Sequence, residues 1–280
     1  RVGAVYAQVA PVTAGAGELL IPHERSLREA RFLARYDRFI AAVELDGCSV
    51  DAHCVNPGRM EGLVRPGARA WVSEVPPGSK RKLRYTLELL EIDGRFVGAN
   101  TVVPNRLAEI LVRGGHVPGL VRFRRLRREV RYGDRSRIDL LLEQGPRRHF
   151  VEVKNCHLVY PDGGAYFPDS VSARAAGHLA ELAAAVRGGD RATVLFTLQR
   201  GDGRFLRPSR LHDPVFAEAA TEAHRAGVRF RAVALEPRLE GFRFLGALPV
   251  RLGAYDAAAL APYREALAAC SGWRRRGGRR

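Results

Sequence analysis

The sequence predicts two domains, a small β-barrel followed by a mixed sheet flanked by helices, which together make an α+β or α/β protein. In the first half, short β-like runs are separated by turns rich in Gly, Pro and Asp. In the second half, strand-like and helix-like segments alternate. At 280 residues the chain is long enough for each half to bury a core of its own.

The N-terminal part begins with a segment that carries little periodic pattern. Residues 1–24 are mostly small residues with several Pro and Gly, so we expect a flexible extension there. Residues 25–103 then form the first domain. Five short strands separated by turns predict a small OB-like barrel, a fold that often binds strands of nucleic acid. The five β-like runs are residues 38–45, 49–55, 68–75, 85–92 and 96–103.

Two loops of this domain carry basic residues. Lys80, Arg81 and Lys82 follow a Pro-Pro-Gly turn, and Arg59 follows an Asn-Pro-Gly turn. Long cationic side chains on loops can reach phosphate groups, although a solvated loop is the alternative for each. The neighbouring pair at residues 53–54, His and Cys, is better explained by a half-buried strand histidine than by a metal site.

Residues 104–118 are predicted to link the domains. Pro104 begins a helical pattern over residues 104–113, and a Gly-Gly pair ends it. The second domain, residues 119–251, opens with an arginine-rich segment at residues 122–137, which would suit a groove that follows phosphates. Within it, Glu129 is a candidate third carboxylate for the site described next, with a salt bridge as the equal alternative.

The segment from Arg137 to Asn155 carries the candidate chemistry. It predicts two strands joined by a turn at residues 144–148. Side chains alternate along a strand, so Glu152 and Lys154 share a face, and Asp139 lies beside Glu152 if the register allows. Two carboxylates suit Mg²⁺ or Mn²⁺, and a lysine beside them can position a water molecule. An ordinary solvated charge pair is the alternative.

The rest of the second domain has α/β texture. A helix is predicted at residues 171–187, where Arg174 and His178 share a face because they are four residues apart. His178 is assigned to phosphate contact or to structure rather than to acid catalysis. A buried strand at 192–198, a helix at 213–226 and a strand at 228–235 follow. Residues 252–280 are predicted as a C-terminal helix, over 254–270, and a disordered basic tail.

The charge balance favours a polyanionic partner. The chain has 46 Lys and Arg against 30 Asp and Glu, a formal net charge of +16, although arginine-rich codon usage is an alternative explanation. The four cysteines have no metal-binding spacing, and free thiols in a reducing compartment explain them most simply. No apolar run approaches the length of a membrane span. We therefore expect a cytoplasmic protein, and association with the nucleoid is compatible with that expectation.

Several motifs make the chain resemble a known family. Residues 136–139 together with 151–155 look like the Asp…Glu-x-Lys core of the PD-(D/E)XK nuclease superfamily. More narrowly, the chain resembles the bacterial sugar fermentation stimulation protein family (SfsA) over residues 30–251. Further matching segments are residues 53–60, 80–82, 100–101, 104–107, 129–133 and 167–169. The family pattern is incomplete around residue 177, where Ala173, Ala175 and Gly177 replace Glu, Gly and Lys.

The resemblance implies an OB-like barrel, a PD-(D/E)XK nuclease-like domain and DNA binding. Combined with the residues, it predicts a sequence-tolerant DNA-binding protein with a Mg²⁺- or Mn²⁺-dependent nuclease site for DNA or RNA. Asp139 and Glu152 would bind the metal, with help from the Val153 carbonyl, and Lys154 would position water. A non-catalytic regulator of sugar (maltose) metabolism genes is the alternative. DNA is the expected partner, RNA and a homodimer stay open, and no membrane is expected. The predicted nucleic-acid contacts are Arg59, Lys80, Arg81, Lys82, Arg137, Arg174 and His178.

Overall fold

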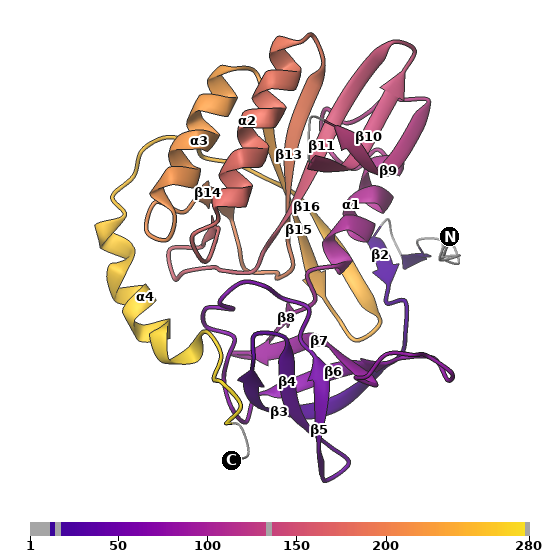
Figure 1. The fold of residues 1–280 in the computed structure, drawn as a ribbon, viewed down its shortest axis with the longest axis vertical. Coiled ribbons are helices and arrows are strands. Elements are labelled where there is room, and N and C mark those ends of the chain that lie inside the picture. Colours follow the sequence, from indigo (N-terminus) through magenta and orange to yellow (C-terminus); the bar gives the residue numbers. More distant parts are fainter. Residues whose placement is uncertain (1–11, 15–17, 133–135, 278–280) are drawn as a thin grey trace.

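A computed structural model describes residues 12–14, 18–132 and 136–277. It shows two domains, with the smaller one below the larger one in Figure 1. The smaller domain, residues 27–98, is termed the OB domain, and the sheet with its helices is termed the large domain. The chain passes from the OB domain to the large domain through helix α1 (Val103–Arg113).

The OB domain is a six-stranded sheet within residues 27–98, all of which are described. Its strand order is β5-β4-β3-β6-β7-β8. In addition, β5, the first strand in this order, pairs with β7. Asp46-Gly47 and Asp93-Gly94 both adopt positive φ, the backbone conformation of tight hairpin turns. The strands are β3 (Leu27–Tyr36), β4 (Ile40–Leu45), β5 (Cys48–His53), β6 (Arg69–Glu74), β7 (Tyr85–Ile92) and β8 (Arg95–Gly98).

Two elements of the OB domain differ from the sequence prediction. Strand β3 was not predicted, yet it lies in the centre of the sheet and pairs with both β4 and β6. Its arginines and glutamate obscure the alternation, although Ala30 and Phe32 are buried. Strand β8 ends at Gly98 rather than at residue 103, because the Asn100 side chain accepts a hydrogen bond from Val102 N–H and turns the chain towards α1.

In the described ranges, the large domain holds eight strands in the order β1-β2-β16-β15-β13-β11-β10-β9. Strands β11, β13 and β15 are parallel, and the other pairs are antiparallel, so the sheet is mixed as predicted. The strands are β1 (Val12–Ala14), β2 (Glu18–Pro22), β9 (Arg125–Tyr132), β10 (Ser136–Gln144), β11 (Arg147–Cys156), β13 (Arg191–Leu198), β15 (Arg229–Pro237) and β16 (Gly241–Leu248). A separate parallel pair consists of β12 (Gly164–Phe167) and β14 (Phe205–Pro208).

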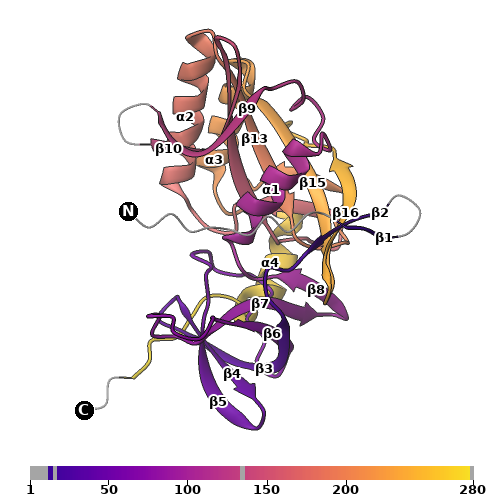
Figure 2. The same ribbon diagram turned by 90° about the vertical axis from the view of Figure 1, so that its right-hand side faces the viewer.

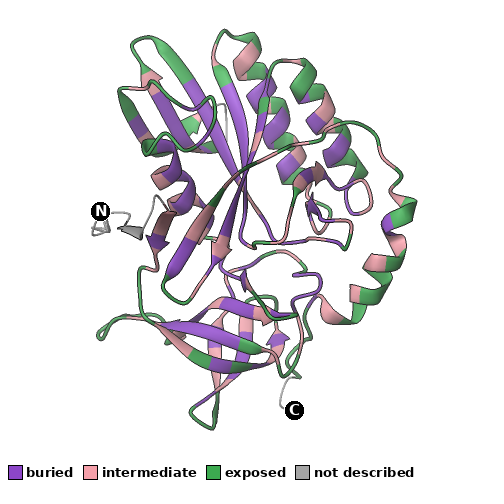
Figure 3. Cartoon of the chain, turned by 180° about the vertical axis from the view of Figure 1, so that it is seen from behind, coloured by how far each residue is buried: buried purple, intermediate pink, exposed green. Residues whose placement is uncertain are grey.

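Helices cover both faces of the large sheet (Figure 2). Helices α2 (Ala173–Arg187) and α3 (Pro214–Arg225) pack on one face, and Ser172 and Asp213 cap their first turns. Helix α1 packs on the other face, in a core that also contains Trp71 and Leu89 of the OB domain. The outward faces of α2 and α3 are exposed, whereas the central strands are largely buried (Figure 3). No helix in the described ranges has the length and apolar character that crossing a membrane requires.

The two ends of the chain correct two predictions. Residues 18–22, predicted as part of a flexible extension, form strand β2, which pairs with β16 and buries Ile21. Residues 1–11 and 15–17 lie outside the described residues. The predicted helix at 254–270 is shorter, with α4 (Ala261–Leu267) between two 3₁₀ turns, η1 (Ala258–Leu260) and η2 (Ala268–Cys270).

The basic tail, predicted to be disordered, contacts the OB domain as far as it is described. Arg274 pairs with Tyr36, and Arg276 forms an ion pair with Asp51. Pairing with β3 gives the tail backbone hydrogen bonds that its composition does not reveal. Figure 1 shows α4 running outside both domains towards this contact.

Candidate active site

Asp139, Glu152 and Lys154 lie together where β10 and β11 begin to separate. The antiparallel register of these strands places Leu140 opposite Val151. Val151 and Val153 are buried in the core around α1. Since side chains alternate, Glu152 and Lys154 point to the other face, towards α2, as the sequence predicts.

Asp139 is held by two donors. Its carboxylate accepts hydrogen bonds from the Asn105 side chain at 2.8 Å and from the Val153 N–H at 2.7 Å. The bond from Val153 N–H joins β11 to β10 just beyond their last paired residues, Leu140 and Val151. Burial, followed by the negative charge of Glu152, raises the pKa of Asp139 to about 6. Burial is the larger cause, and repulsion by the Glu152 carboxylate adds to it.

Glu152 is buried, and its two oxygens have different surroundings. Oε1 accepts hydrogen bonds from Lys154 Nζ at 2.7 Å and from His178 Nδ1 at 2.6 Å. Oε2 is buried without a hydrogen-bond partner among the described residues. Burial opposes ionisation, but the bonds from His178 and Lys154 leave the pKa of Glu152 below its usual value. Glu152 is therefore ionised at neutral pH and has one buried oxygen that no described residue satisfies.

His178 reaches this site from α2, a contact that the sequence does not predict. Its Nδ1 carries the proton when it donates to Glu152, and in a neutral imidazole Nε2 is then an acceptor. Arg174 Nε lies 3.5 Å from that Nε2 and supplies a donor. His178 is buried, which places it behind Glu152 and makes direct contact with a phosphate secondary to holding the carboxylate.

Tyr132 and Glu181 complete the surroundings of the acidic pair. Burial, and then the charges of Glu152 and Glu181, raise the pKa of Tyr132. Tyr132 Oη and Glu181 Oε2 both lack a hydrogen-bond partner within the described part of the chain. Neither residue stands out in the sequence, because a tyrosine on a strand and a glutamate on a helix are common. Asn105 lies in a matched motif, but its partner was not predictable.

The other predicted contacts are spread over the surface. Lys80, Arg81 and Lys82 are exposed in the β6–β7 loop, where Arg81 donates to His53 Nδ1 at 2.7 Å. Arg59 and Arg137 are also exposed, on the OB domain and on β10. Of the predicted arginine and lysine contacts, Arg174 is the one whose described hydrogen bonds lead to the acidic pair. It bonds His178, which in turn bonds Glu152.

Other candidate ligands do not join the acidic pair. Glu129 is exposed, with φ of 49°, and forms neither a hydrogen bond nor an ion pair with the described residues. Cys54 is buried against Met60, and His53 bonds Arg81, so these two side chains do not act as a pair. Within the described ranges, no three His, Cys, Asp or Glu side chains converge on one metal position. The candidate site therefore offers two carboxylates.

A buried hydrogen-bond network joins the OB domain to the large domain. Glu61 of the OB domain accepts a bond from Tyr160 Oη at 2.6 Å, and its other oxygen lies 2.7 Å from His212 Nε2. Ser209 Oγ lies 2.8 Å from His212 Nδ1. Nearby, Asp169 accepts the Met60 N–H at 2.9 Å, shortly before α2 begins. Satisfied buried networks of this kind hold a single arrangement of the parts that they join.

Comparison with known proteins gives one consistent result. Residues 33–99 match the model of the SfsA N-terminal OB domain, and residues 102–241 match that of the sugar fermentation stimulation protein RE domain. A sugar fermentation stimulation protein homolog from Thioalkalivibrio sulfidiphilus is 47% identical over 75% of this chain and 89% of its own length. The homolog from Geobacter sulfurreducens is 44% identical over 82% of this chain and 98% of its own length.

A solved structure gives the same answer for the fold. SfsA of Pyrococcus furiosus in complex with Ca²⁺ is similar with a TM-score of 0.76 and 30% identity. The similarity covers 83% of this chain and 98% of that one. On the two domain models, the relatives and the shared fold, this chain belongs to the sugar fermentation stimulation protein (SfsA) family.

Proposed function

We propose that this protein is a divalent-metal-dependent nuclease that hydrolyses phosphodiester bonds of DNA or RNA with little sequence preference. The observation that carries the proposal is the placement of Asp139, Glu152 and Lys154 on neighbouring strands, with Glu152 Oε2 left without a hydrogen-bond partner among the described residues. The net charge of +16 favours a polyanionic substrate.

The residues present fit a hard divalent cation. Asp139 and Glu152 are close enough for the charge of one to raise the pKa of the other, and a cation between them would relieve that repulsion. Mg²⁺ commonly binds through one or two carboxylates and completes its shell with water and substrate phosphate. The related Pyrococcus furiosus protein was solved with Ca²⁺, an ion that also prefers oxygen ligands. We therefore infer Mg²⁺ or Mn²⁺ as the working ion.

Each residue of the site would have a separate role. A divalent cation at this position would lower the pKa of a bound water and offset charge on the phosphate. Asn105 and the Val153 N–H fix the direction of the Asp139 carboxylate. His178 fixes Glu152 and keeps it ionised. Lys154 Nζ, whose side chain is 13% exposed, has further donors with which to orient water or to stabilise developing negative charge.

A DNA-binding regulator without catalysis is the competing proposal. It would share the basic surface and the two domains. However, two buried carboxylates that face a polyanion would repel it unless a metal lies between them, so regulation alone gives no reason for Asp139 and Glu152. The acidic pair therefore favours catalysis.

Labelled single- and double-stranded DNA and RNA incubated with the full chain and Mg²⁺ or Mn²⁺ test the proposal. Hydrolysis is expected with the wild type and is expected to be lost in Glu152→Gln, while nucleic-acid affinity measured in EDTA is retained. Glu129→Gln is the matched control, because it removes an exposed carboxylate on the neighbouring strand β9. Equal hydrolysis by wild type and Glu152→Gln would show that this site does not cleave.

A further inference from the structure

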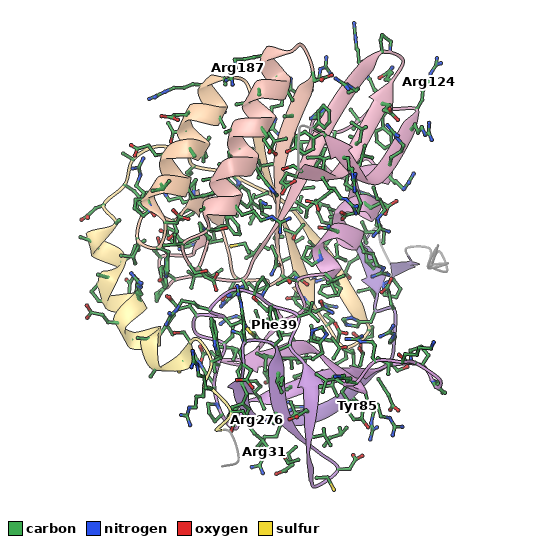
Figure 4. All side chains as sticks on the ribbon, viewed as in Figure 1. Arg31, Phe39, Tyr85, Arg124, Arg187 and Arg276 are labelled. Atoms are coloured by element: carbon green, nitrogen blue, oxygen red, sulfur yellow. The ribbon has the colours of Figure 1, made fainter. Side chains whose placement is uncertain are left out.

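Two exposed aromatic side chains lie beside the same arginine of the OB domain, although they are far apart in the sequence. Phe39 and Trp273 are each 43% exposed, and they are the two aromatic residues among the large apolar side chains exposed in the described ranges. The Arg38 guanidinium carbon lies 5.4 Å from the ring centre of Phe39 and 5.7 Å from that of Trp273. Arg38, Phe39 and Trp273 are termed the aromatic cluster. Figure 4 labels Phe39 at the end of the OB domain nearest the large domain.

The C-terminal tail holds Trp273 in place. On one side of it, Gly272 N–H donates to the Arg59 carbonyl at 2.6 Å, and on the other, Arg274 N–H donates to the Arg35 carbonyl at 3.0 Å. Arg35 is buried, and its guanidinium lies 5.5 Å from the Trp273 ring centre. Trp273 is therefore an anchored ring with an open surface.

The surroundings of the aromatic cluster are positively charged. Five arginines lie on or beside it, against two aspartates, and one of these, Asp51, is neutralised by two hydrogen bonds from Arg276 at 2.6 Å. The other, Asp37, accepts the Arg276 N–H at 3.2 Å. Arg81, in the basic β6–β7 loop, bonds His53 on β5. His53 pairs with Ile40, the residue that follows Phe39. The five arginines are Arg38, Arg59, Arg274, Arg275 and Arg276.

The backbone that presents Arg38 is unfavourable for the residues that occupy it. Asp37 has φ of 44° and Arg38 has φ of 67°, in the turn between β3 and β4. Glycine adopts this left-handed conformation at less cost than an arginine does. The Arg38 side chain at this position contacts both exposed rings and the Pro57 carbonyl.

We propose that the aromatic cluster is a stacking platform for single-stranded nucleic acid, supplied in part by the C-terminal tail. Flat aromatic faces accept any base, and cations beside them bind the phosphates that connect the bases. The turn after β3 and the β6–β7 loop are also the regions through which OB folds contact oligonucleotides. The inference rests on the proposed function for its ligand class and adds where on the OB domain the strand binds.

The aromatic cluster is also connected to the large domain near α2. Arg38 Nε donates to the Pro57 carbonyl at 3.0 Å, and the same loop reaches Asp169 through the Met60 N–H. Asp169 precedes α2, the helix that supplies His178. A strand that stacks on Phe39 and Trp273 would thus lie at the boundary between the domains, on the side of α2.

The test measures binding of a fluorescein-labelled oligothymidine to the full chain in EDTA by anisotropy. Removing one stacking ring is expected to weaken binding roughly 5- to 150-fold, so Trp273→Ala and Phe39→Ala should both lose affinity. Trp273→Phe should stay within about threefold of the wild type, because it keeps a ring. Val215→Ala is the control, since Val215 is exposed on α3 and should have no effect.

Tryptophan fluorescence gives a second readout that a structural role would not move. The chain has two tryptophans, and Trp71 is buried. Oligothymidine should therefore quench the wild-type emission through Trp273, and the quenching should be absent in Trp273→Phe. If the wild type binds but neither alanine variant weakens binding and no quenching occurs, the platform is wrong and the nucleic acid binds elsewhere on the chain. If the wild type binds no nucleic acid even at low salt, the proposed function fails and the platform fails with it.

Discussion

Replacing Asp139 with Asn should make the stability of the metal-free protein less dependent on pH. Burial and the neighbouring Glu152 raise the pKa of Asp139 from 3.8 to about 6. A carboxyl group with a raised pKa destabilises the folded state once it ionises, so the penalty is absent below about pH 4 and complete above about pH 6. At about 1.4 kcal/mol for each pKa unit, this penalty amounts to roughly 3 kcal/mol at neutral pH.

The variant also carries a cost that does not change with pH. Asp139 accepts from both Asn105 and Val153, whereas an amide has one oxygen, so one donor loses its partner. Such a loss costs about 1–3 kcal/mol. The informative quantity is therefore how the difference in unfolding free energy between Asp139→Asn and wild type changes with pH.

Urea unfolding in EDTA between about pH 4 and pH 8 measures this quantity. The difference should shift in favour of Asp139→Asn by roughly 3 kcal/mol as pH rises. Replacing EDTA with saturating Ca²⁺ should remove most of that shift, because the ion would stabilise the wild type. Glu129→Gln, which removes an exposed carboxylate, should show no comparable trend. A difference that stays constant over the whole range would refute the paired, buried carboxylates on which the site depends.

Three further outcomes are expected. His178→Ala removes the bond that lowers the pKa of Glu152, so the acid limb of the kcat/KM profile for hydrolysis should move to higher pH. Tyr160→Phe removes the bond to Glu61 between the domains and should lower the unfolding free energy in urea by about 1–3 kcal/mol. Alanine at all of residues 80–82 should weaken binding to every sequence alike and reduce the slope of log affinity against log salt by up to about 3.

Each of these outcomes has a result that contradicts it. An unmoved acid limb in His178→Ala would mean that another group sets the ionisation of Glu152. Wild-type stability in Tyr160→Phe would mean that water replaces the lost partner between the domains. An unchanged salt slope in the triple variant would assign the β6–β7 loop to solvent.

The sequence predicted the acidic pair because a side chain in a strand points to one of only two faces. Alternation alone places Glu152 and Lys154 on one face, and the hairpin brings Asp139 beside them. The contacts behind the pair were not predictable, since His178 and Asn105 come from helices whose packing the local sequence does not specify. The two-domain order followed from the Asp-Gly and Pro-Gly turns, which have strong local signals.

Strands β2 and β3, which the sequence did not predict, depend on partners that are far away in the sequence. Strand β3 contains Arg35, which is buried, and its charge is tolerated because its guanidinium donates to the carbonyls of Arg38, Gly58 and Gly272. Those acceptors come from three separate stretches of chain, so no local pattern reveals them. The same holds for β2, whose place in the sheet depends on β16.

The chain crosses between its two domains more often than the order of the domains suggests. It contributes β1 and β2 to the large sheet before the OB domain begins, and at its other end residues 272–276 return to the OB domain, where Arg274 pairs with β3. A cut between Gly98 and Val103 would therefore leave the large domain without β1 and β2 and the OB domain without Trp273. Fragments trimmed to the two matched segments, 33–99 and 102–241, should fold less stably than the full chain, and any dissection of function should keep the polypeptide whole.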